Sequence, residues 1–294
     1  MKAHSVLANV TPDQVRLEPY PHIVVDDCLP PAYFQELAAN YPSNDVILDY
    51  CRTHQDRLFN FVEGTARAND RYDVSAYQAL DHPEPLSEAW LKFIQYHTSS
   101  AFFSEVVNVC GDAIRRVYPA LEDTIGRPLE AMTTGVRYRS DCDISLDCQI
   151  GINTPAESRS SVRRVHVDAR EELFAILLYF RDPADDTEGG NLEICRWKNP
   201  RRKRFRRSEV DEGDAELLVT VEYKANRMVM FINSQDSLHA VTPRDPSPHT
   251  RKLVNIIGEV DKSIPKGLFV LPKKKDLNYL RRKIASKWKK LLGA

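Results

Sequence analysis

The stretch that decides the fold runs His166-Val-Asp-Ala-Arg-Glu-Glu-Leu-Phe-Ala-Ile-Leu-Leu-Tyr-Phe180. Its second half, residues 173–180, is a nearly continuous apolar run that is too short for a typical buried helix, so we expect a β-strand. Its first half carries His166 and Asp168, which lie two positions apart and therefore point to the same face of an extended chain. An imidazole and a carboxylate held together before a core strand are candidate metal ligands.

Two residues farther along the chain extend this pattern. His239 follows the apolar segment 228–232, and Arg251 opens the apolar segment 252–257. Two histidines and one carboxylate fill half of an octahedral coordination shell, which suits a non-haem Fe(II) oxygenase. An arginine nearby could hold the far carboxylate of a dicarboxylic cosubstrate. Taken alone, each residue has a simpler interpretation: His239 as a loop histidine bound by the backbone, and Arg251 as a surface arginine.

A second His-x-Asp motif, His54-Gln-Asp56, lies in a polar segment with no apolar strand after it. We interpret that copy as a solvated segment. The candidate catalytic and metal-binding set is therefore His166, Asp168 and His239.

The remaining segments predict an α+β protein. A helix is expected to begin at Pro30-Pro31, because proline fits the first helical turn, and others are expected over 87–108 and 113–121. Residues 43–85 are expected to be irregular, with a short helix near 75–80. Alternating or short apolar runs predict strands at 23–25, 129–139, 144–152, 191–197, 217–223, 227–233 and 252–257.

With these residues in place, the chain resembles the Fe(II)- and 2-oxoglutarate-dependent oxygenase superfamily, and specifically its prolyl-4-hydroxylase-like branch. That family carries His-x-Asp, a distal histidine and a following basic residue, matched here by His166, Asp168, His239 and Arg251. The run Glu188-Gly-Gly-Asn-Leu192 resembles the family's link between two core strands. The resemblance extends over about residues 20–260, and its specific part begins near residue 130.

The resemblance implies a double-stranded β-helix of the jelly-roll or cupin type at about 129–260. Helices from about 30–125 would buttress it within a single oxygenase domain, 1–265. It also implies Fe(II), 2-oxoglutarate as cosubstrate and O2, with hydroxylation of an unactivated C–H bond and release of succinate and CO2. Arg251 would pair with the C5 carboxylate of 2-oxoglutarate. Tyr138 lies where relatives often place a cosubstrate-binding tyrosine, and its other interpretation is a strand residue with its ring in the core.

Two positions test the match to this family. Family members often carry a serine two positions after the arginine, where this chain has Leu253, so one cosubstrate hydrogen bond is in doubt. Relatives that halogenate replace the metal carboxylate with a small residue. Because Asp168 is present, the pattern favours a hydroxylase.

Composition narrows the class further. The chain has 294 residues, 42% of them hydrophobic, as in an ordinary globular protein. No apolar stretch approaches the length of a membrane span, and the N-terminus lacks the apolar core of a signal peptide, so we expect a cytoplasmic protein. The six cysteines form no Cys-x-x-Cys pair, which argues against a zinc ribbon and favours free thiols.

The net charge of −1 hides a strong asymmetry. Residues 266–294 hold ten Lys or Arg and one acid, Asp276, a charge of +9, which leaves −10 for residues 1–265. Residues 276–292 predict a basic amphipathic helix, which could dock on the protein's own core or lie on an anionic membrane surface. The second placement would put the protein at the inner face of a membrane, where it could act on a lipid-linked substrate.

A second basic segment, Arg201-Arg-Lys-Arg-Phe-Arg-Arg207, is either a solvated hairpin tip or a clamp for an anionic group on the substrate. Its single aromatic residue argues against nucleic-acid binding. Arg163 and its neighbours Arg159 and Arg164, close to the metal motif, likewise either form a solvated loop or contact an anionic group on the substrate. The substrate is thus small or carrier-linked, with an anionic group as one option.

Two competing functions remain at this point. One is a non-catalytic β-barrel module that binds an anionic surface or nucleic acid through its basic segments and has no need of iron. The other is an enzyme of the same fold that uses a different metal. The ordered spacing of His166, Asp168, His239 and Arg251 favours the oxygenase over both.

Overall fold

Strand β4 (Ile144–Asn153) shows how the fold is built. Its outward positions are Ile144, Leu146, Cys148, Ile150 and Ile152, all fully buried, and its inward positions are polar. Side chains alternate across a strand, so one face of β4 seals a hydrophobic core while the other presents Asp147, Gln149 and Asn153 to an interior space. The computed structural model describes residues 4–53, 69–139, 141–161, 163–260, 264 and 267–272.

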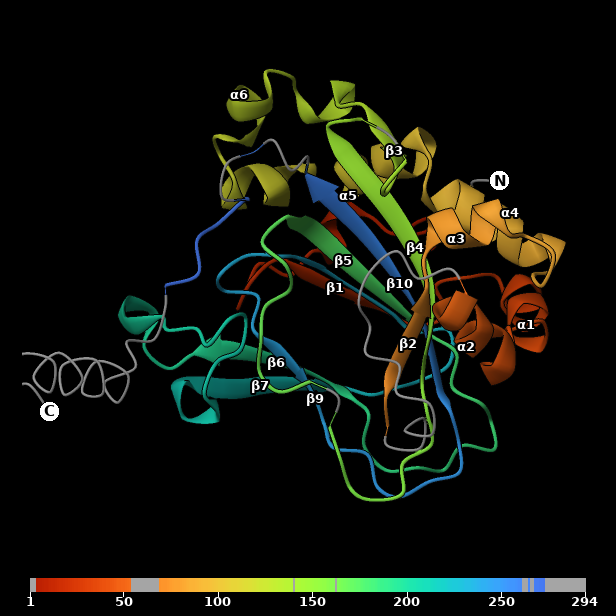
Figure 1. Cartoon of the computed structure of the whole chain (residues 1–294). Coiled ribbons are helices and arrows are strands. Elements are labelled where there is room, and N and C mark those ends of the chain that lie inside the picture. The colour runs from red at the N-terminus through yellow and green to blue at the C-terminus, as the bar shows by residue number, and fades with distance from the viewer. Residues whose placement is uncertain are drawn as a thin grey trace, which may run out of the picture.

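Two sheets enclose that interior (Figure 1). The major sheet has the order β1-β8-β5-β10-β4-β2, and β3 pairs in parallel with β4. Its strands are β1 (His22–Val25), β2 (Arg71–Val74), β3 (Thr134–Val136), β4, β5 (Glu172–Tyr179), β8 (Met228–Ile232) and β10 (Arg251–Val260). The minor sheet has the order β7-β6-β9, made of β6 (Leu192–Trp197), β7 (Ala215–Val221) and β9 (His239–Val241).

From β4 onward the chain winds back and forth between the two sheets. It leaves β4, pairs with β9 at His166, returns to the major sheet as β5, crosses to β6 and β7, returns as β8, crosses to β9 and ends as β10. This winding is that of a double-stranded β-helix, so the predicted α+β fold with that core is confirmed.

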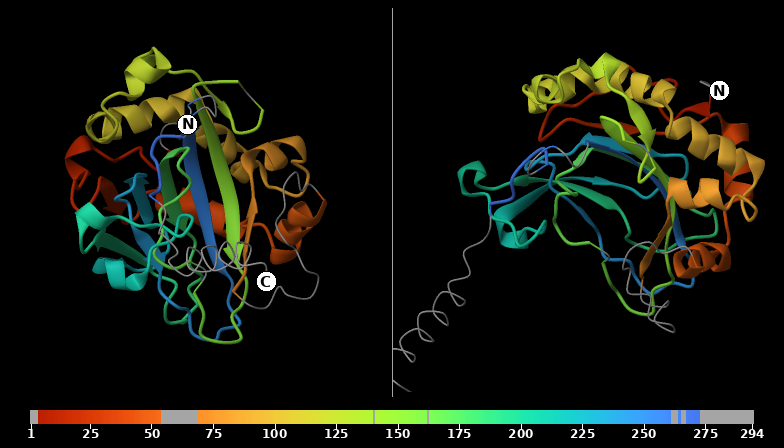
Figure 2. Two further views of the ribbon diagram at one scale, coloured as in Figure 1. Left: turned by 60° about the vertical axis from the view of Figure 1, so that its left-hand side comes forward. Right: turned by 45° about the horizontal axis from the view of Figure 1, so that its top comes forward.

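Helices cover the outer face of the major sheet, as both views of Figure 2 show. They are α1 (Pro31–Ala39), α2 (Asn44–Thr53), α3 (Ala76–Asp81), α4 (Glu88–His97), α5 (Ser100–Val117) and α6 (Leu121–Ile125). Trp90, Phe93 and Phe102 are almost completely buried against the outward residues of the sheet. Most of the buried apolar residues of the described chain belong to this helix-to-sheet layer, and each Å² of buried apolar surface contributes about 25 cal/mol.

The N-terminal half departs from the sequence prediction in three places. The helix expected over 87–108 is two helices, because the Ser99 side chain accepts a hydrogen bond from the Phe102 backbone N–H and caps a new helix. The segment expected to be irregular contains α2 and β2. Strand β2 forms because its backbone pairs with β4, a long-range contact that its polar sequence does not announce.

Candidate active site

His166 and His239 are brought together by backbone pairing between segments 73 positions apart. The two residues exchange backbone hydrogen bonds of 2.9 and 3.0 Å, and their rings lie 4.2 Å apart. Asp168 reaches the same point two positions later. One ligand atom from each of the three residues lies within 4.8 Å of the others, so the predicted cluster is assembled.

Both imidazoles are oriented by their backbones. His166 Nδ1 lies 2.7 Å from the Arg164 carbonyl oxygen, and His239 Nδ1 lies 2.9 Å from the Ser237 carbonyl oxygen. Because a carbonyl can only accept, each Nδ1 carries the proton and each Nε2 keeps its lone pair. The Nε2 atoms lie 3.4 and 3.6 Å from the two Asp168 carboxylate oxygens. This is the tautomer that a metal ion requires, held in place by hydrogen bonds to the main chain.

The protonation states of this cluster also suit a cation. Burial, with the neighbouring His239, lowers the pKa of His166 to about 4, so its imidazole is neutral at pH 7. Burial by itself would favour a protonated Asp168, but the two histidines hold its pKa well below the usual range. Two imidazole nitrogens and one carboxylate form a mixed donor set that leaves several positions of an octahedral ion open.

Arg251 begins β10 and points into the interior with 3% of its surface exposed. Its Nε donates to the Gly190 carbonyl oxygen at 2.9 Å, and its Nη1 donates to Asn153 Oδ1 at 3.1 Å. A side chain at Gly190, which has a φ of +72°, would come within 3.2 Å of the Arg251 side chain. The glycine pair predicted as a strand link thus makes room for the guanidinium.

Donor groups without acceptors surround this guanidinium. Asn153 Nδ2 is buried with no hydrogen-bond partner in the described structure. Apart from its contact with Arg251, the buried Tyr179 hydroxyl also lacks a partner among the residues described. Buried donors are rarely left unpaired in folded proteins. A carboxylate, which accepts at both oxygens, has the chemistry that these groups and Arg251 require.

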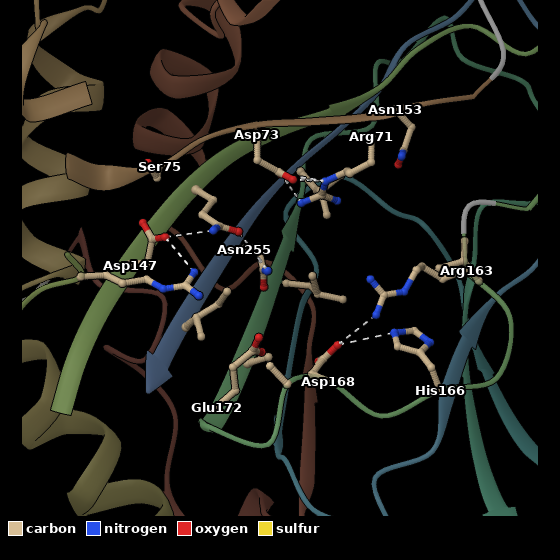
Figure 3. Close-up of a pocket in the computed structure, with 18 of the residues that line it drawn as sticks. Arg71, Asp73, Ser75, Asp147, Asn153, Arg163, His166, Asp168, Glu172 and Asn255 are labelled. Carbon is tan, nitrogen blue, oxygen red and sulfur yellow. Dashed lines mark hydrogen bonds and ion pairs between the residues drawn. The ribbon is translucent and has the colours of Figure 1, made fainter. Parts of the chain in front are cut away.

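The metal-ligand cluster and Arg251 line one cavity of about 960 Å³ (Figure 3). Its apolar wall comes from inward residues of both sheets, namely Ala175, Leu177, Leu192, Phe231, Val241, Leu253 and Ile257. Its polar wall comes from β2, β4 and β10. The cavity is therefore large enough for a cosubstrate together with a second molecule.

Several charged groups in this cavity lie outside the predicted site. Arg71 pairs with Asp73 on β2, Arg137 pairs with Asp147, and Glu172 lies near Asp168. Burial, together with the Asp168 and Glu259 carboxylates, raises the pKa of Glu172 well above its usual range. The available sequence signal was the alternation of β4, which predicts inward polar positions but not which residues of other strands they meet.

Tyr138 is the predicted site residue whose structure differs from expectation. It lies in a turn after β3 with a φ of +70°, is 47% exposed, and packs its ring against Tyr77 at the rim of the cavity. The interpretation as a strand residue with a core ring is wrong, because β3 ends at Val136. The tyrosine rings that lie against Arg251 are Tyr179 and Tyr223, at 5.1 and 4.8 Å.

The basic residues near the metal motif and in the 201–207 segment differ in whether they reach the cavity. Arg163 lines the cavity, with its guanidinium 3.9 Å from Asp168 Oδ1, whereas Arg159 pairs with Asp245 at the surface. In the 201–207 segment, Phe205 is buried against Trp197, and Lys203 pairs with Asp236. The predicted helix over 276–292 and the motif at 54–56 lie outside the described residues.

The six cysteines are free thiols, as the sequence predicted. Within the described residues, no helix combines the length and the apolar character needed to cross a bilayer.

A double-stranded β-helix with two histidines and a carboxylate gathered inside it is the arrangement of a non-haem metal enzyme. The family model of the 2OG-Fe(II) oxygenase superfamily matches residues 158–257, a segment that holds His166, Asp168, His239 and Arg251. The match covers about a third of the chain, and with the site it indicates a 2-oxoglutarate-dependent dioxygenase that uses Fe(II), 2-oxoglutarate and O2.

Three solved structures illustrate the likeness. A prolyl 4-hydroxylase from Phytophthora capsici is 16% identical, with a TM-score of 0.48 over 94% of this chain and 71% of that chain. A prolyl-4-hydroxylase from Pseudomonas putida is 16% identical, with a TM-score of 0.41 over 89% of this chain and 100% of that one. A rice dioxygenase for auxin oxidation is 14% identical, with a TM-score of 0.45 over 90% of this chain and 86% of that one.

Values this low carry neither a substrate nor a reaction over to this chain, and the prolyl-4-hydroxylase-like branch stays a prediction. No curated protein sequence matches the chain.

Proposed function

We propose that His166, Asp168 and His239 bind Fe(II), and that the enzyme hydroxylates a C–H bond of a small or carrier-linked molecule held in the interior cavity. The observation that carries the proposal is the pair of Nε2 lone pairs and the Asp168 carboxylate converging within 4.8 Å. The backbone carbonyls that accept from each Nδ1–H hold the imidazoles in this orientation before any ion binds.

Arg251, Asn153 and Tyr179 are the proposed site for the C5 carboxylate of 2-oxoglutarate. Asn153 replaces the hydrogen bond that the family's serine would supply, which accounts for Leu253 at that position. The ring of Tyr179 packs against Arg251, so Tyr179 takes the role that the sequence assigned to Tyr138. Because these groups are buried, their charge-assisted hydrogen bonds orient the cosubstrate as well as bind it.

When bound, the iron and 2-oxoglutarate supply the oxidising chemistry, in which one O2 gives succinate, CO2 and an alcohol on the substrate. The protein's part is to place one C–H bond and to keep water and other groups away. Ala175, Phe231 and Leu253 belong to the apolar wall of the cavity, and the Phe231 ring packs against His239.

Where the substrate lies is also part of the proposal. Arg163, about half exposed beside Asp168, is where an anionic group on the substrate would be met. A membrane-bound substrate and a cytoplasmic location remain predictions from the sequence.

Anaerobic titration of the metal-free protein with Fe(II) and 2-oxoglutarate tests the assignment, with the visible charge-transfer band of the chelate as readout. We expect the wild-type protein to form the band and His166→Ala to lose it. In Arg251→Ala, half-saturation should need about ten-fold more 2-oxoglutarate or greater, because a hydrogen bond to a charged group contributes about 1.5–3 kcal/mol.

His82→Ala and Arg196→Ala are matched controls, because both residues are exposed and neither lines the cavity. Both should behave as wild type. A well-folded wild-type protein without the band would remove the iron and cosubstrate roles from these residues.

A further inference from the structure

A chain of polar side chains crosses the cavity wall from β4 to β10, and its direction is set by one carboxylate. Asp147 accepts from Gln149 Nε2 at 2.9 Å, so Gln149 must direct its oxygen away from Asp147. That oxygen accepts from Asn255 Nδ2 at 3.3 Å. Asn255 therefore turns its own Oδ1 to the far side, where it is buried and has no donor in the described structure.

Glu172 is the second acceptor without a partner. Its carboxyl group lines the cavity and makes no side-chain hydrogen bond or ion pair with any described residue. Arg137, which follows β3 and lines the cavity, is already bonded to Asp147 and Glu259, and its buried Nε has no hydrogen-bond partner in the described structure. Three carboxylates thus share one guanidinium on this wall, and Glu172 is the one left without a partner.

The two free acceptors face the same part of the cavity. In Figure 3 the Asn255 amide and the Glu172 carboxyl group point toward one another, on the side of the cavity next to Asp168. An ammonium group has three N–H bonds, so it can donate to both of these oxygen acceptors at once. Burial and the Asp168 and Glu259 carboxylates raise the pKa of Glu172 in the empty cavity, and a positive charge beside it would favour its ionised form and pair with it.

We propose that the substrate carries a protonated amine, which donates hydrogen bonds to Glu172 and to Asn255 Oδ1. This inference rests on the proposed function for its placement, since it puts the ammonium group in the cavity that holds the metal ligands. A carboxylate or phosphate at this position would add a negative charge beside Glu172 and Asp147, whose pKa values burial already raises, so the site disfavours an anion. The anionic substrate group considered from the sequence would have to lie elsewhere, beside Arg163.

Calorimetric titration tests the proposal with three amines, each paired with its fully N-acetylated form: n-pentylamine, 1,5-diaminopentane and L-lysine. Acetylation removes the charge and keeps the carbon chain. The protein is loaded anaerobically with Fe(II) and 2-oxoglutarate, and the visible band is recorded in the same titrations. We expect at least one amine to bind about ten-fold tighter than its acetylated form or better, and to shift the band.

Glu172→Gln keeps the shape of the side chain and removes the carboxylate. The amine and its acetylated form should then bind with affinities within about two-fold of each other. Glu171→Gln is the matched control, because Glu171 pairs with Arg170 and is absent from the cavity lining. It should keep the wild-type preference. Asn255→Leu removes the second acceptor and should lower amine affinity several-fold. Because the two substitutions lie on different strands, the same loss in both is not explained by a folding defect in one of them.

Equal binding of the amines and their acetylated forms, or an amine preference that survives in Glu172→Gln, would overturn the proposal. Failure of the proposed function looks different. In that case the visible band is missing before any amine is added, while Glu172 and Asn255 can still discriminate amines by calorimetry on the metal-free protein.

Discussion

At the scale of single residues, the site depends on where protons are placed. His166 and His239 each give their Nδ1 proton to a backbone carbonyl, which leaves both Nε2 atoms free to bind a cation. Asn153 and Asn255 each leave one polar atom of the side-chain amide without a partner. Each uses one end of the amide for a bond within the protein and leaves the other end buried and free in the cavity. A buried polar atom without a partner destabilises the empty protein, and it favours binding of a ligand that forms the missing hydrogen bond.

Asn153 gives the residue-scale prediction. Asn153→Ala removes the orphaned Nδ2 and also the acceptor that orients Arg251 Nη1, so 2-oxoglutarate binding should weaken by about five- to thirty-fold, the effect of one or two hydrogen bonds. The chelate band at fixed Fe(II) measures this. Metal binding without cosubstrate should be unchanged, since Asn153 is not among the metal ligands. Unaltered 2-oxoglutarate affinity would show that Arg251 is oriented by other contacts.

At the scale of elements, strand β10 connects the functions of the cavity. Its inward positions alternate with outward core residues, so Arg251 and Asn255 both enter the cavity, with Leu253 between them. A slip of one residue in its register would turn both polar residues into the core behind the sheet. Antiparallel pairing along both edges, with β4 and β5, prevents that slip.

Gly258 on β10 gives the element-scale prediction. A methyl group there would lie 2.2 Å from Cε1 of the Phe174 ring, which is fully buried on β5. Gly258→Ala should therefore lower the free energy of unfolding by about 1–3 kcal/mol, the usual cost of overpacking a core. Urea unfolding measures the change. Gly213→Ala, where nothing lies within 4 Å, is the control and should stay close to wild type.

At the scale of the whole molecule, stability is tied to pH by a histidine far from the site. His97 is fully buried on α4, where Nδ1 donates to the Phe93 carbonyl oxygen and Nε2 accepts from the Val6 N–H. Both bonds require the neutral ring. Burial lowers the pKa of His97 to about 3, against 6.5 for a histidine exposed to water. The unfolded chain therefore binds a proton at a pH where the folded protein does not.

The sign of the pH dependence follows from that difference. The stabilising contribution is complete above pH 6.5 and is lost as the pH falls toward 3, by up to about 1.4 kcal/mol per pH unit. We expect urea unfolding between pH 7 and pH 4.5 to show this decline in wild type, and His97→Gln to show a shallower one from a lower starting stability. The exposed His82→Gln should keep the wild-type slope. An unchanged slope in His97→Gln would assign the decline to other groups.

The sequence by itself determined the metal-ligand candidates, Arg251 and most of the core strands. Those features depend on local spacing: residues two apart share a strand face, and short apolar runs are buried strands. It did not reveal β9, which is only three residues long, or β2, which forms through its pairing with β4. For Tyr138 it predicted a strand where the chain turns.

Only the tertiary structure decided which polar residues meet in the cavity. Asn153 lies opposite Arg251 in the pairing of β4 with β10, and Glu172 lies opposite Glu259 in the pairing of β5 with β10, although the paired residues are about 90 to 100 positions apart in the sequence. No local pattern contains that register, since it is selected by the burial of the whole outer face of the sheet against the helices. The sequence therefore determined the oxygenase chemistry, and the pairing of distant strands decided where a cosubstrate and a substrate can bind.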